Sequence, residues 1–135
     1  METSSVIPRR ILVVDDEPLV CLSLKMLLGS DGHRVVTANS AEEGWAFLCG
    51  GGFDLVIADY AMPLVKGDQL AVRIKKRWPD QPIMLITVYA EILESGPSQP
   101  AYADAFVSKP FRLEDLRAAI ARVTSSTIAP SVSVA

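Results

Sequence analysis

Five short apolar runs recur along the chain and alternate for most of its length with segments of helical periodicity. The runs fall at 11–14, 34–38, 53–59, 82–87 and 104–108. Runs such as ILVV and LVIA contain β-branched residues and no polar interruption, which is typical of strands covered on both faces. The pattern therefore predicts five strands in the interior of one domain.

Helices are predicted between these runs. The first begins at Pro18, which suits a first helical turn, and ends between Gly29 and Gly32. The second follows SAEE (40–43), which reads as a capping box, and runs to the glycines at 50–52. Two later helices are marked by apolar residues one turn apart: Leu70, Ala71, Ile74 and Trp78 in one, and Leu113, Leu116, Ile120 and Val123 in the other.

The two ends of the chain lack this alternation. Residues 125–135 carry no charge and no helical period, so we interpret them as a flexible C-terminal tail. Residues 1–9 are interpreted as an N-terminal tail, which leaves one domain over 10–124. Pro97 and Pro100 predict that the fourth helix is short and ends near Ser95, because proline disrupts a helix interior.

Strands that alternate with helices indicate an α/β fold with a parallel sheet covered by helices on both faces. The first strand is not followed by Gly-x-Gly-x-x-Gly, and the chain contains no Walker-type lysine loop. We therefore do not expect a nucleotide-binding member of this architecture. Ligands of open parallel sheets bind beyond the carboxyl ends of the strands, so the residues at those ends are the informative ones.

Composition and charge narrow the classes further. Half of the 135 residues are apolar, which is ordinary for a globular domain, and the net charge of −3 argues against general nucleic-acid binding. No apolar segment approaches the length of a membrane span, and METSSVIPRR lacks the apolar core of a signal peptide. We expect a soluble, cytoplasmic protein.

Charged and polar residues stand where the predicted strands stop. Asp15 and Asp16 end the first strand, Asp59 the third, Thr87 the fourth, and Lys109 follows the fifth. Adjacent carboxylates repel, and a hard divalent cation such as Mg²⁺ would offset that repulsion. A carboxylate beside Mg²⁺ and a lysine is equipped to accept a phosphoryl group, while the hydroxyl donates a hydrogen bond to it.

These residues lie in motifs of a known family. LVVDDEP (12–18), DLVIADYAMP (54–63) with Gly67, Thr87, and FVSKPF (106–111) together resemble the receiver domain of bacterial two-component response regulators. The resemblance covers about residues 10 to 124. It implies a (βα)₅ flavodoxin-like three-layer sandwich with a parallel sheet in the order 2-1-3-4-5.

The resemblance also implies roles for individual residues. Asp59 matches the phosphoacceptor, which receives a phosphoryl group from a phosphohistidine. Asp15 and Asp16 match the acidic pair that holds Mg²⁺ together with Asp59 and the backbone carbonyl of Ala61. Such a protein is a switch with at most slow self-dephosphorylation, and not a turnover enzyme.

Three further roles follow from the same resemblance. Lys109 matches the lysine that contacts the phosphoryl group, Thr87 the switch hydroxyl, and Phe106 the aromatic residue whose rotamer reports the switch. Phe106 is equally compatible with an ordinary core aromatic. The Lys109–Pro110 peptide bond is expected to be cis.

The sequence departs from the family pattern near the fourth strand. Val88 stands where the family usually has Ala or Gly, and its bulk is expected to restrict access to Asp59 or to alter the movement of Thr87. Phe106 replaces a more frequent Tyr, and Tyr102 replaces a usual Gly. These changes lie on the signalling face of the family, which the fourth helix, fifth strand and fifth helix form.

The resemblance implies partners as well. The expected phosphodonor is a histidine kinase or histidine phosphotransfer protein, and the expected output is phosphorylation-dependent binding of a protein target, without direct contact to nucleic acid or membrane. The signalling face is a candidate surface for a homodimer. No output domain follows residue 124 in this sequence, so we expect a single-domain regulator, with a relay intermediate or a detached relative of the receivers of hybrid kinases as alternatives.

Two other functions compete with this one. An adaptor that uses the fold only for binding would explain the unusual fourth-helix region, although the intact acidic set opposes it. A phosphatase of the haloacid-dehalogenase kind also uses an aspartyl nucleophile at a strand end. Such an enzyme needs a second aspartate two residues later, where this chain has Ala61.

Three isolated residues are given structural interpretations. Cys21 and Cys49 match no metal or redox spacing, so both are predicted to be buried free thiols. His33 follows Asp31 and Gly32 in a predicted turn, and we expect it to face solvent.

Overall fold

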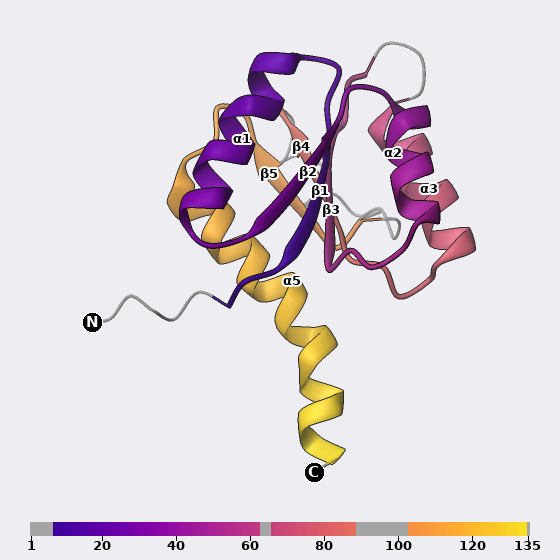
Figure 1. Ribbon diagram of the computed structural model, residues 1–135, viewed down its shortest axis with the longest axis vertical. Coiled ribbons are helices and arrows are strands. Elements are labelled where there is room, and N and C mark those ends of the chain that lie inside the picture. Colours follow the sequence, from indigo (N-terminus) through magenta and orange to yellow (C-terminus); the bar gives the residue numbers. More distant parts are fainter. Residues whose placement is uncertain (1–6, 63–65, 89–102, 135) are drawn as a thin grey trace.

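The chain folds around one parallel sheet with helices on both faces (Figure 1). The computed structural model describes residues 7–62, 66–88 and 103–134, the last ten by their backbone alone. The strands are β1 (Arg10–Val14), β2 (Arg34–Ala38), β3 (Leu55–Asp59), β4 (Ile83–Thr87) and β5 (Ala105–Ser108). The helices are α1 (Pro18–Ser30), α2 (Ala41–Cys49), α3 (Gly67–Arg77) and α5 (Leu113–Val134).

The strand order is β2-β1-β3-β4-β5, and every neighbouring pair is parallel. This confirms the expected fold class and strand order. β1, β3 and β4 lie inside the sheet. β3 and β4 are buried along their whole length, and only Arg10 of β1 is exposed, so their apolar runs have no polar interruption.

Alternate residues of the strands enter two separate cores. Leu12 and Val14 of β1 point to the side covered by α2 and α3, where they join Leu70 and Ile74. Ile11 and Val13 point to the other side, which α1 and α5 cover. Each face is therefore sealed by its own pair of helices, as Figure 1 shows.

The start of α2 differs slightly from the predicted capping box. Ser40 is the N-cap, and its hydroxyl accepts a hydrogen bond from the Glu43 N–H at 3.1 Å. The Glu43 carboxylate bonds instead to the N–H of Asn39, at 2.7 Å. The return bond therefore reaches one residue further back than predicted, and it still satisfies a backbone donor at the helix start.

The C-terminal segment is the largest difference from the prediction. Helix α5 continues through residue 124 to Val134 and projects beyond the sheet (Figure 1), whereas the sequence predicted a tail without helical structure. Extending an existing helix costs far less than starting one, so a weak pattern suffices there, even though Pro130 has no N–H to donate. The proposed domain limits stay a prediction.

Three predictions about single residues are wrong. His33 is only 8% exposed, and its Nδ1 accepts a hydrogen bond of 2.9 Å from the N–H of Arg9, the residue before β1. Cys49 is exposed at the end of α2, while Cys21 is buried as predicted, and both are free thiols. Trp78, predicted as a helix residue, stands directly after the last residue of α3.

An ion pair connects the two helices on the α1 side. Arg117 of α5 donates two hydrogen bonds of 2.8 Å to the Asp31 carboxylate at the end of α1. The Arg117 guanidinium holds the pKa of Asp31 below its usual value. This bidentate contact fixes α5 against α1 across a sequence separation of 86 residues.

Among the described residues, no helix is long and apolar enough to cross a membrane. The predictions for the fourth helix, Pro97, Pro100 and Tyr102 fall on residues 89–102, which lie outside the described part of the chain.

Candidate functional site

The carboxyl ends of the strands bring the predicted site residues to one edge of the sheet. Asp59 is the last residue of β3 and Thr87 the last of β4, while Asp15 directly follows β1. Lys109 directly follows β5, and its N–H donates a hydrogen bond of 3.0 Å to the carbonyl oxygen of Thr87. Parallel pairing in register therefore places residues distant in sequence side by side.

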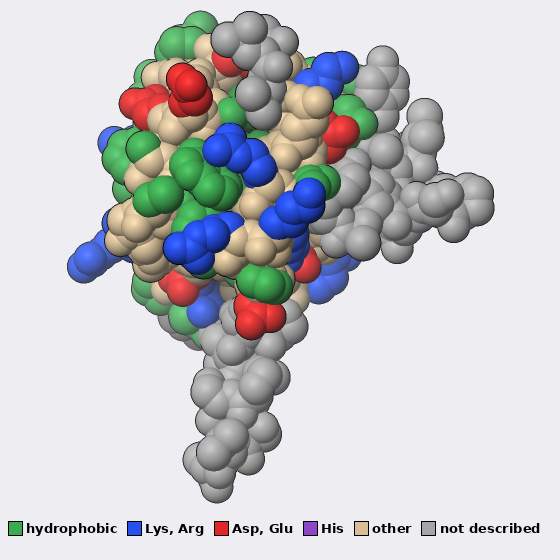
Figure 2. Space-filling view, turned by 90° about the vertical axis from the view of Figure 1, so that its right-hand side faces the viewer, with side chains coloured by type: hydrophobic (Ala, Val, Ile, Leu, Met, Phe, Trp, Pro, Cys, Tyr) green, Lys and Arg blue, Asp and Glu red, His purple; other side chains and the backbone are tan. Residues whose placement is uncertain are grey.

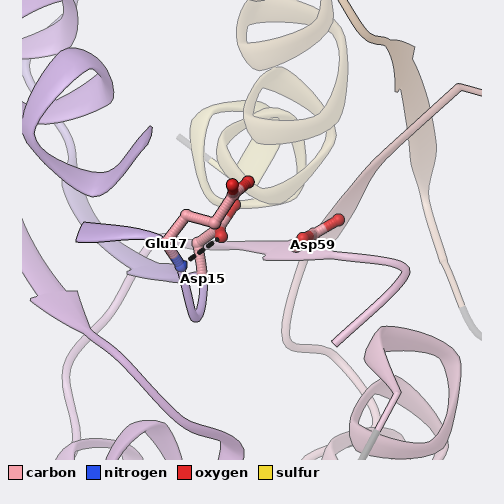
Figure 3. Close-up of side chains that lie close together, drawn as sticks. All are labelled: Asp15, Glu17 and Asp59. Carbon is pink, nitrogen blue, oxygen red and sulfur yellow. Dashed lines mark hydrogen bonds between the residues drawn. The ribbon is translucent and has the colours of Figure 1, made fainter. Parts of the chain in front are cut away.

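Three carboxylates form a compact acidic group at this edge. One oxygen each from Asp15, Glu17 and Asp59 lies within 4.8 Å of the others. Figure 3 shows Asp15 and Glu17 together in the turn after β1, with Asp59 facing them from the end of β3. The Glu17 N–H also donates a hydrogen bond of 2.9 Å to Asp15 Oδ1, which fixes the turn.

One member of this group was not predicted from the sequence. Asp16 was predicted as a metal ligand, yet it is half-buried and is not part of the acidic group. Glu17 lies in the acidic group, although no role was predicted for it, and the role of Asp16 stays a prediction. The run of three acids at 15–17 indicated that Glu17 could belong to an acidic group. The direction of each side chain, however, depends on how the chain turns into α1 at Pro18.

Burial makes the charge on Asp15 unfavourable. The residue is 1% exposed, and this burial is the main reason that the pKa of its carboxyl rises from 3.8 to about 6. The hydrogen bond from the Glu17 backbone lowers the pKa, while the nearby Asp59 charge raises it further. A bound cation would relieve both desolvation and repulsion.

Lys109 supplies the positive charge of the site. Its Nζ lies 3.3 Å from Asp59 Oδ1, and the side chain is 25% exposed. The N–H of Ala61 donates a hydrogen bond of 3.2 Å to the same carboxylate oxygen. Asp59, only 5% exposed, is therefore oriented from both sides.

Gly67 allows α3 to begin directly beside this carboxylate. Its N–H donates a hydrogen bond of 3.0 Å to the carbonyl oxygen of Tyr60. A Cβ at this position would collide with the backbone oxygen of Asp59 and lie 2.8 Å from the Cα of Tyr60. The close approach therefore requires glycine, which explains its place in the motif that suggested the family.

The predicted switch residues are buried to different degrees. Thr87 is 4% exposed at the end of β4, and Phe106 is 7% exposed in the core on the α2 and α3 side. Val88, the residue that departs from the family pattern, is 62% exposed. The Lys109–Pro110 bond is cis, as expected.

The donor set fits a hard divalent cation. It consists only of carboxylate oxygens, and at least two of them, from Asp15 and Asp59, belong to buried side chains. Mg²⁺ prefers a few such oxygens and keeps several waters. The acidic group is therefore consistent with a divalent cation site.

The chain belongs to the response regulator receiver domain family, whose sequence pattern matches residues 11–121. This confirms the resemblance that the motifs indicated. Receiver domains pair with histidine kinases and are typically phosphoacceptor switches and not enzymes.

Two solved structures show the same fold. A receiver domain protein from Clostridium thermocellum is 30% identical and superposes with a TM-score of 0.80, covering 88% of this chain and 96% of that one. The response regulator TrrA from Thermotoga maritima, in complex with Mg²⁺ and BeF, is 35% identical with a TM-score of 0.76. The superposition covers 85% of this chain and 98% of the TrrA chain.

The similar curated proteins are longer than this chain. The transcriptional regulatory protein TcrA of Mycobacterium tuberculosis is 30% identical over 107 residues, which is 79% of this chain and 42% of TcrA. The chain thus spans less than half the length of this relative.

Proposed function

We propose that Asp59 accepts a phosphoryl group from a phosphohistidine and that the protein signals through phosphorylation-dependent partner binding. The observation that supports this most directly is the position of Asp59, with Lys109 Nζ at 3.3 Å and two further carboxylates within 4.8 Å. A buried carboxylate beside a cation and an acidic group suited to Mg²⁺ has the parts that phosphoryl transfer needs.

In the proposed step, a carboxylate oxygen of Asp59 attacks the phosphorus of the phosphoimidazole. A new O–P bond forms, the P–N bond breaks, and its electron pair returns to the imidazole nitrogen. Lys109 stabilises the negative charge of the transferred oxygens, and the Ala61 N–H orients the attacking carboxylate. The hydroxyl of Thr87 is proposed to donate a hydrogen bond to the phosphoryl group once it is bound.

Asp15, Glu17 and Asp59 are the side chains that would hold Mg²⁺. The predicted contributions of Asp16 and of the Ala61 carbonyl remain part of the proposal. When bound, the cation neutralises charge on the phosphoryl oxygens. TrrA, which shares the fold, was crystallised with Mg²⁺ and BeF, and this supports a divalent cation at the corresponding edge of this sheet.

The phosphodonor has a suitable surface beside the site. Helix α1 starts directly after the acidic turn and exposes Leu19, Leu22 and Met26, at 77%, 52% and 65%. Three apolar side chains one turn apart form a stripe that is costly to leave in water. We propose that a kinase or histidine phosphotransfer protein packs on this stripe and presents its phosphohistidine to Asp59.

The single-domain organisation, the cytoplasmic location and a homodimer through the signalling face stay proposals.

An adaptor function without phosphorylation is the second candidate, because the exposed stripe on α1 could bind a partner unaided. The burial of Asp15 and Asp59 disfavours it, since a binding-only fold gains nothing from burying two carboxylates together. A phosphatase function is disfavoured, because this chain has Ala61 where such an enzyme needs an aspartate as general acid.

The test is labelling with acetyl phosphate and Mg²⁺, followed by intact mass measurement. Wild type should gain one phosphoryl group, whereas Asp59→Ala should gain none. Absence of the added mass on wild type, or equal labelling of the variant, would contradict the proposal. Partner binding that is independent of Mg²⁺ and unchanged by Asp59→Asn would favour the adaptor, and steady turnover of small phosphomonoesters the phosphatase.

A further inference from the structure

The α2 and α3 face carries a cluster of tryptophans and arginines that the proposed phosphoacceptor site does not use. Both tryptophans of the chain are there: Trp45 of α2 and Trp78 after α3 are half-buried, with ring centroids 5.1 Å apart. Arg73 lies over the Trp45 ring at 4.3 Å from its centroid, and Arg77 over the Trp78 ring at 5.1 Å.

These two arginines form no ion pair with any acidic residue that the structure describes. Lys75 on the same helix, by contrast, is bound to Asp104 at 2.8 Å. Arg73 and Arg77 stand one turn apart, which places both charges on one side of α3. Figure 2 shows Lys and Arg side chains among hydrophobic ones across the middle of this face, with acidic side chains towards its margins.

A cavity of about 420 Å³ continues the cluster at the end of α3. Its wall contains Arg77 and Trp78 together with Phe53, Pro79 and Pro82. Asp54 and Asp80 also line it, so an acidic group would be repelled from the cavity itself and attracted to the arginines beside it. The apolar part of its wall, formed by Phe53, Trp78, Pro79 and Pro82, can contact an apolar side chain.

We propose that this face, named here the Trp–Arg face (Trp45, Arg73, Arg77 and Trp78 with the adjoining cavity), docks an acidic protein segment. Carboxylates of the segment pair with Arg73 and Arg77, and an apolar side chain of the segment enters the cavity. Tryptophan and arginine are the residues most enriched at the energetically important centres of protein interfaces. Stacked on the rings, the guanidiniums are held in place before a partner arrives, which lowers the entropy lost on binding.

The composition of the face favours a protein segment over nucleic acid. Tight binding of DNA neutralises many phosphates, and the two unpaired arginines are too few for that. Glu42 and Glu43, in the first turn of α2, would repel a long polyanion.

The position of the face separates it from the phosphoacceptor site. Phe53 and Pro82 precede β3 and β4, so the cavity lies at the amino edge of the sheet, opposite the edge that carries Asp59 and Thr87. The α1 stripe lies on the opposite side of the sheet, because α1 covers the other sheet face. A partner on the Trp–Arg face could therefore bind together with the phosphodonor, and the proposal does not depend on phosphorylation.

Binding can be followed by intrinsic fluorescence, because both tryptophans belong to the cluster. The probes at low ionic strength are a short synthetic peptide of glutamate and leucine at helical spacing, the same peptide with glutamine for glutamate, and a short single-stranded DNA. We expect the acidic peptide to change the fluorescence saturably and to bind more weakly as salt is added. Calorimetric titration provides a second readout.

The double variant Arg73→Glu, Arg77→Glu should weaken peptide binding by about tenfold or more, and Arg73→Gln, Arg77→Gln should weaken it less. The matched control Lys25→Glu, Arg112→Glu makes the same change in net charge at exposed positions elsewhere and should bind as wild type does. Thermal unfolding establishes that each variant is folded.

Four outcomes would overturn the proposal. They are equal binding of the glutamine peptide, stronger binding of the DNA, unchanged peptide binding by both folded double variants, and self-association that the arginine substitutions abolish. The last would assign the face to a second copy of the chain.

Discussion

The Nζ of Lys109 lies 3.3 Å from Oδ1 of Asp59, which joins the end of β5 to the end of β3 across the intervening strand β4. The contact neutralises one of three clustered carboxylates. It also leaves an ammonium group at the point where phosphoryl oxygens would develop charge.

Replacing this lysine should impair phosphorylation more than folding. Lys109→Ala should lower the rate of labelling by acetyl phosphate by about 100-fold, as removal of one electrostatic donor does in comparable sites. Rates are measured from the intact mass over time. Lys66→Ala, an exposed lysine at the start of α3, is the matched control. A Lys109 variant that labels as fast as wild type would show that the ammonium group does not act in the transfer.

Removing the charge of Asp15 should stabilise the protein in the absence of metal. In the folded state the pKa of Asp15 is raised from 3.8 to about 6, so the ionised form at pH 7 opposes folding. Asp15→Asn with a chelator present should therefore raise the free energy of unfolding by on the order of 1–3 kcal/mol. Denaturant unfolding monitored by circular dichroism measures this.

Addition of Mg²⁺ should make wild type more stable than Asp15→Asn, which reverses the order expected without metal. The ion should stabilise wild type through binding to the folded state and should stabilise Asp15→Asn much less. If Mg²⁺ raised the stability of both proteins equally, Asp15 would not be a ligand. The same titration with Asp16→Asn and Glu17→Gln would decide which of those two neighbours completes the site.

Gly67→Ala should damage the site from the backbone side. The new Cβ would collide with the backbone of Asp59 and Tyr60, so we expect a loss of roughly 1–3 kcal/mol in stability and slower labelling. Gly29→Ala is the control, because nothing lies within 4 Å of a Cβ there. That substitution, inside α1, should instead stabilise the protein by about 1 kcal/mol.

His33 should contribute a pH dependence to stability. Burial lowers its pKa below 6.5, and the neutral ring accepts the Arg9 N–H through Nδ1. The unfolded chain binds the proton more readily, so this contribution is complete above pH 6.5 and is lost as the pH falls towards the folded pKa. Asp31 nearby opposes the shift and Arg9 adds to it.

Melting temperatures of wild type and His33→Asn between pH 7.5 and 5 would test this, both ends of that range lying about 1 unit or more from the reference pKa. The asparagine oxygen can replace Nδ1 as acceptor but does not titrate. The difference between the two proteins should therefore shift in favour of the variant as the pH falls. Comparing the two removes the opposite contribution of Asp15, which stabilises on protonation. A difference that is constant with pH would contradict the assignment.

The sheet could be predicted from sequence because its inner strands are apolar except at one end, where Arg10 starts β1, Asp59 ends β3 and Thr87 ends β4. Val56 and Leu85 need no partner information to be placed in a core, and parallel order puts Asp59, Thr87 and Lys109 at one edge. The burial of His33 could not be predicted, because it depends on a contact with Arg9, 24 residues away in the sequence. The position of Glu17 in the acidic group depends in the same way on Asp59, which is distant in sequence and which no local pattern records.

The last turns of α5 were not predicted, for a different reason. Residues 125–134 have no apolar stripe, and periodicity is the signal by which helices are recognised in a sequence. The continuation depends on the turns that precede it, which Arg117 and Leu116 fix to α1 and the sheet. A local window cannot see that support.

Main-chain hydrogen bonds at the end of β4 connect the backbone next to Asp59 with the backbone of Lys109, without using any side chain. The Tyr60 N–H donates to Ile86, and the Lys109 N–H to Thr87, each through a bond of about 3 Å. A small displacement of this strand end would therefore carry the anchor points of Asp59 and Lys109 with it. The backbone of β4 therefore links the strand ends that carry Asp59 and Lys109, whichever residue occupies position 88.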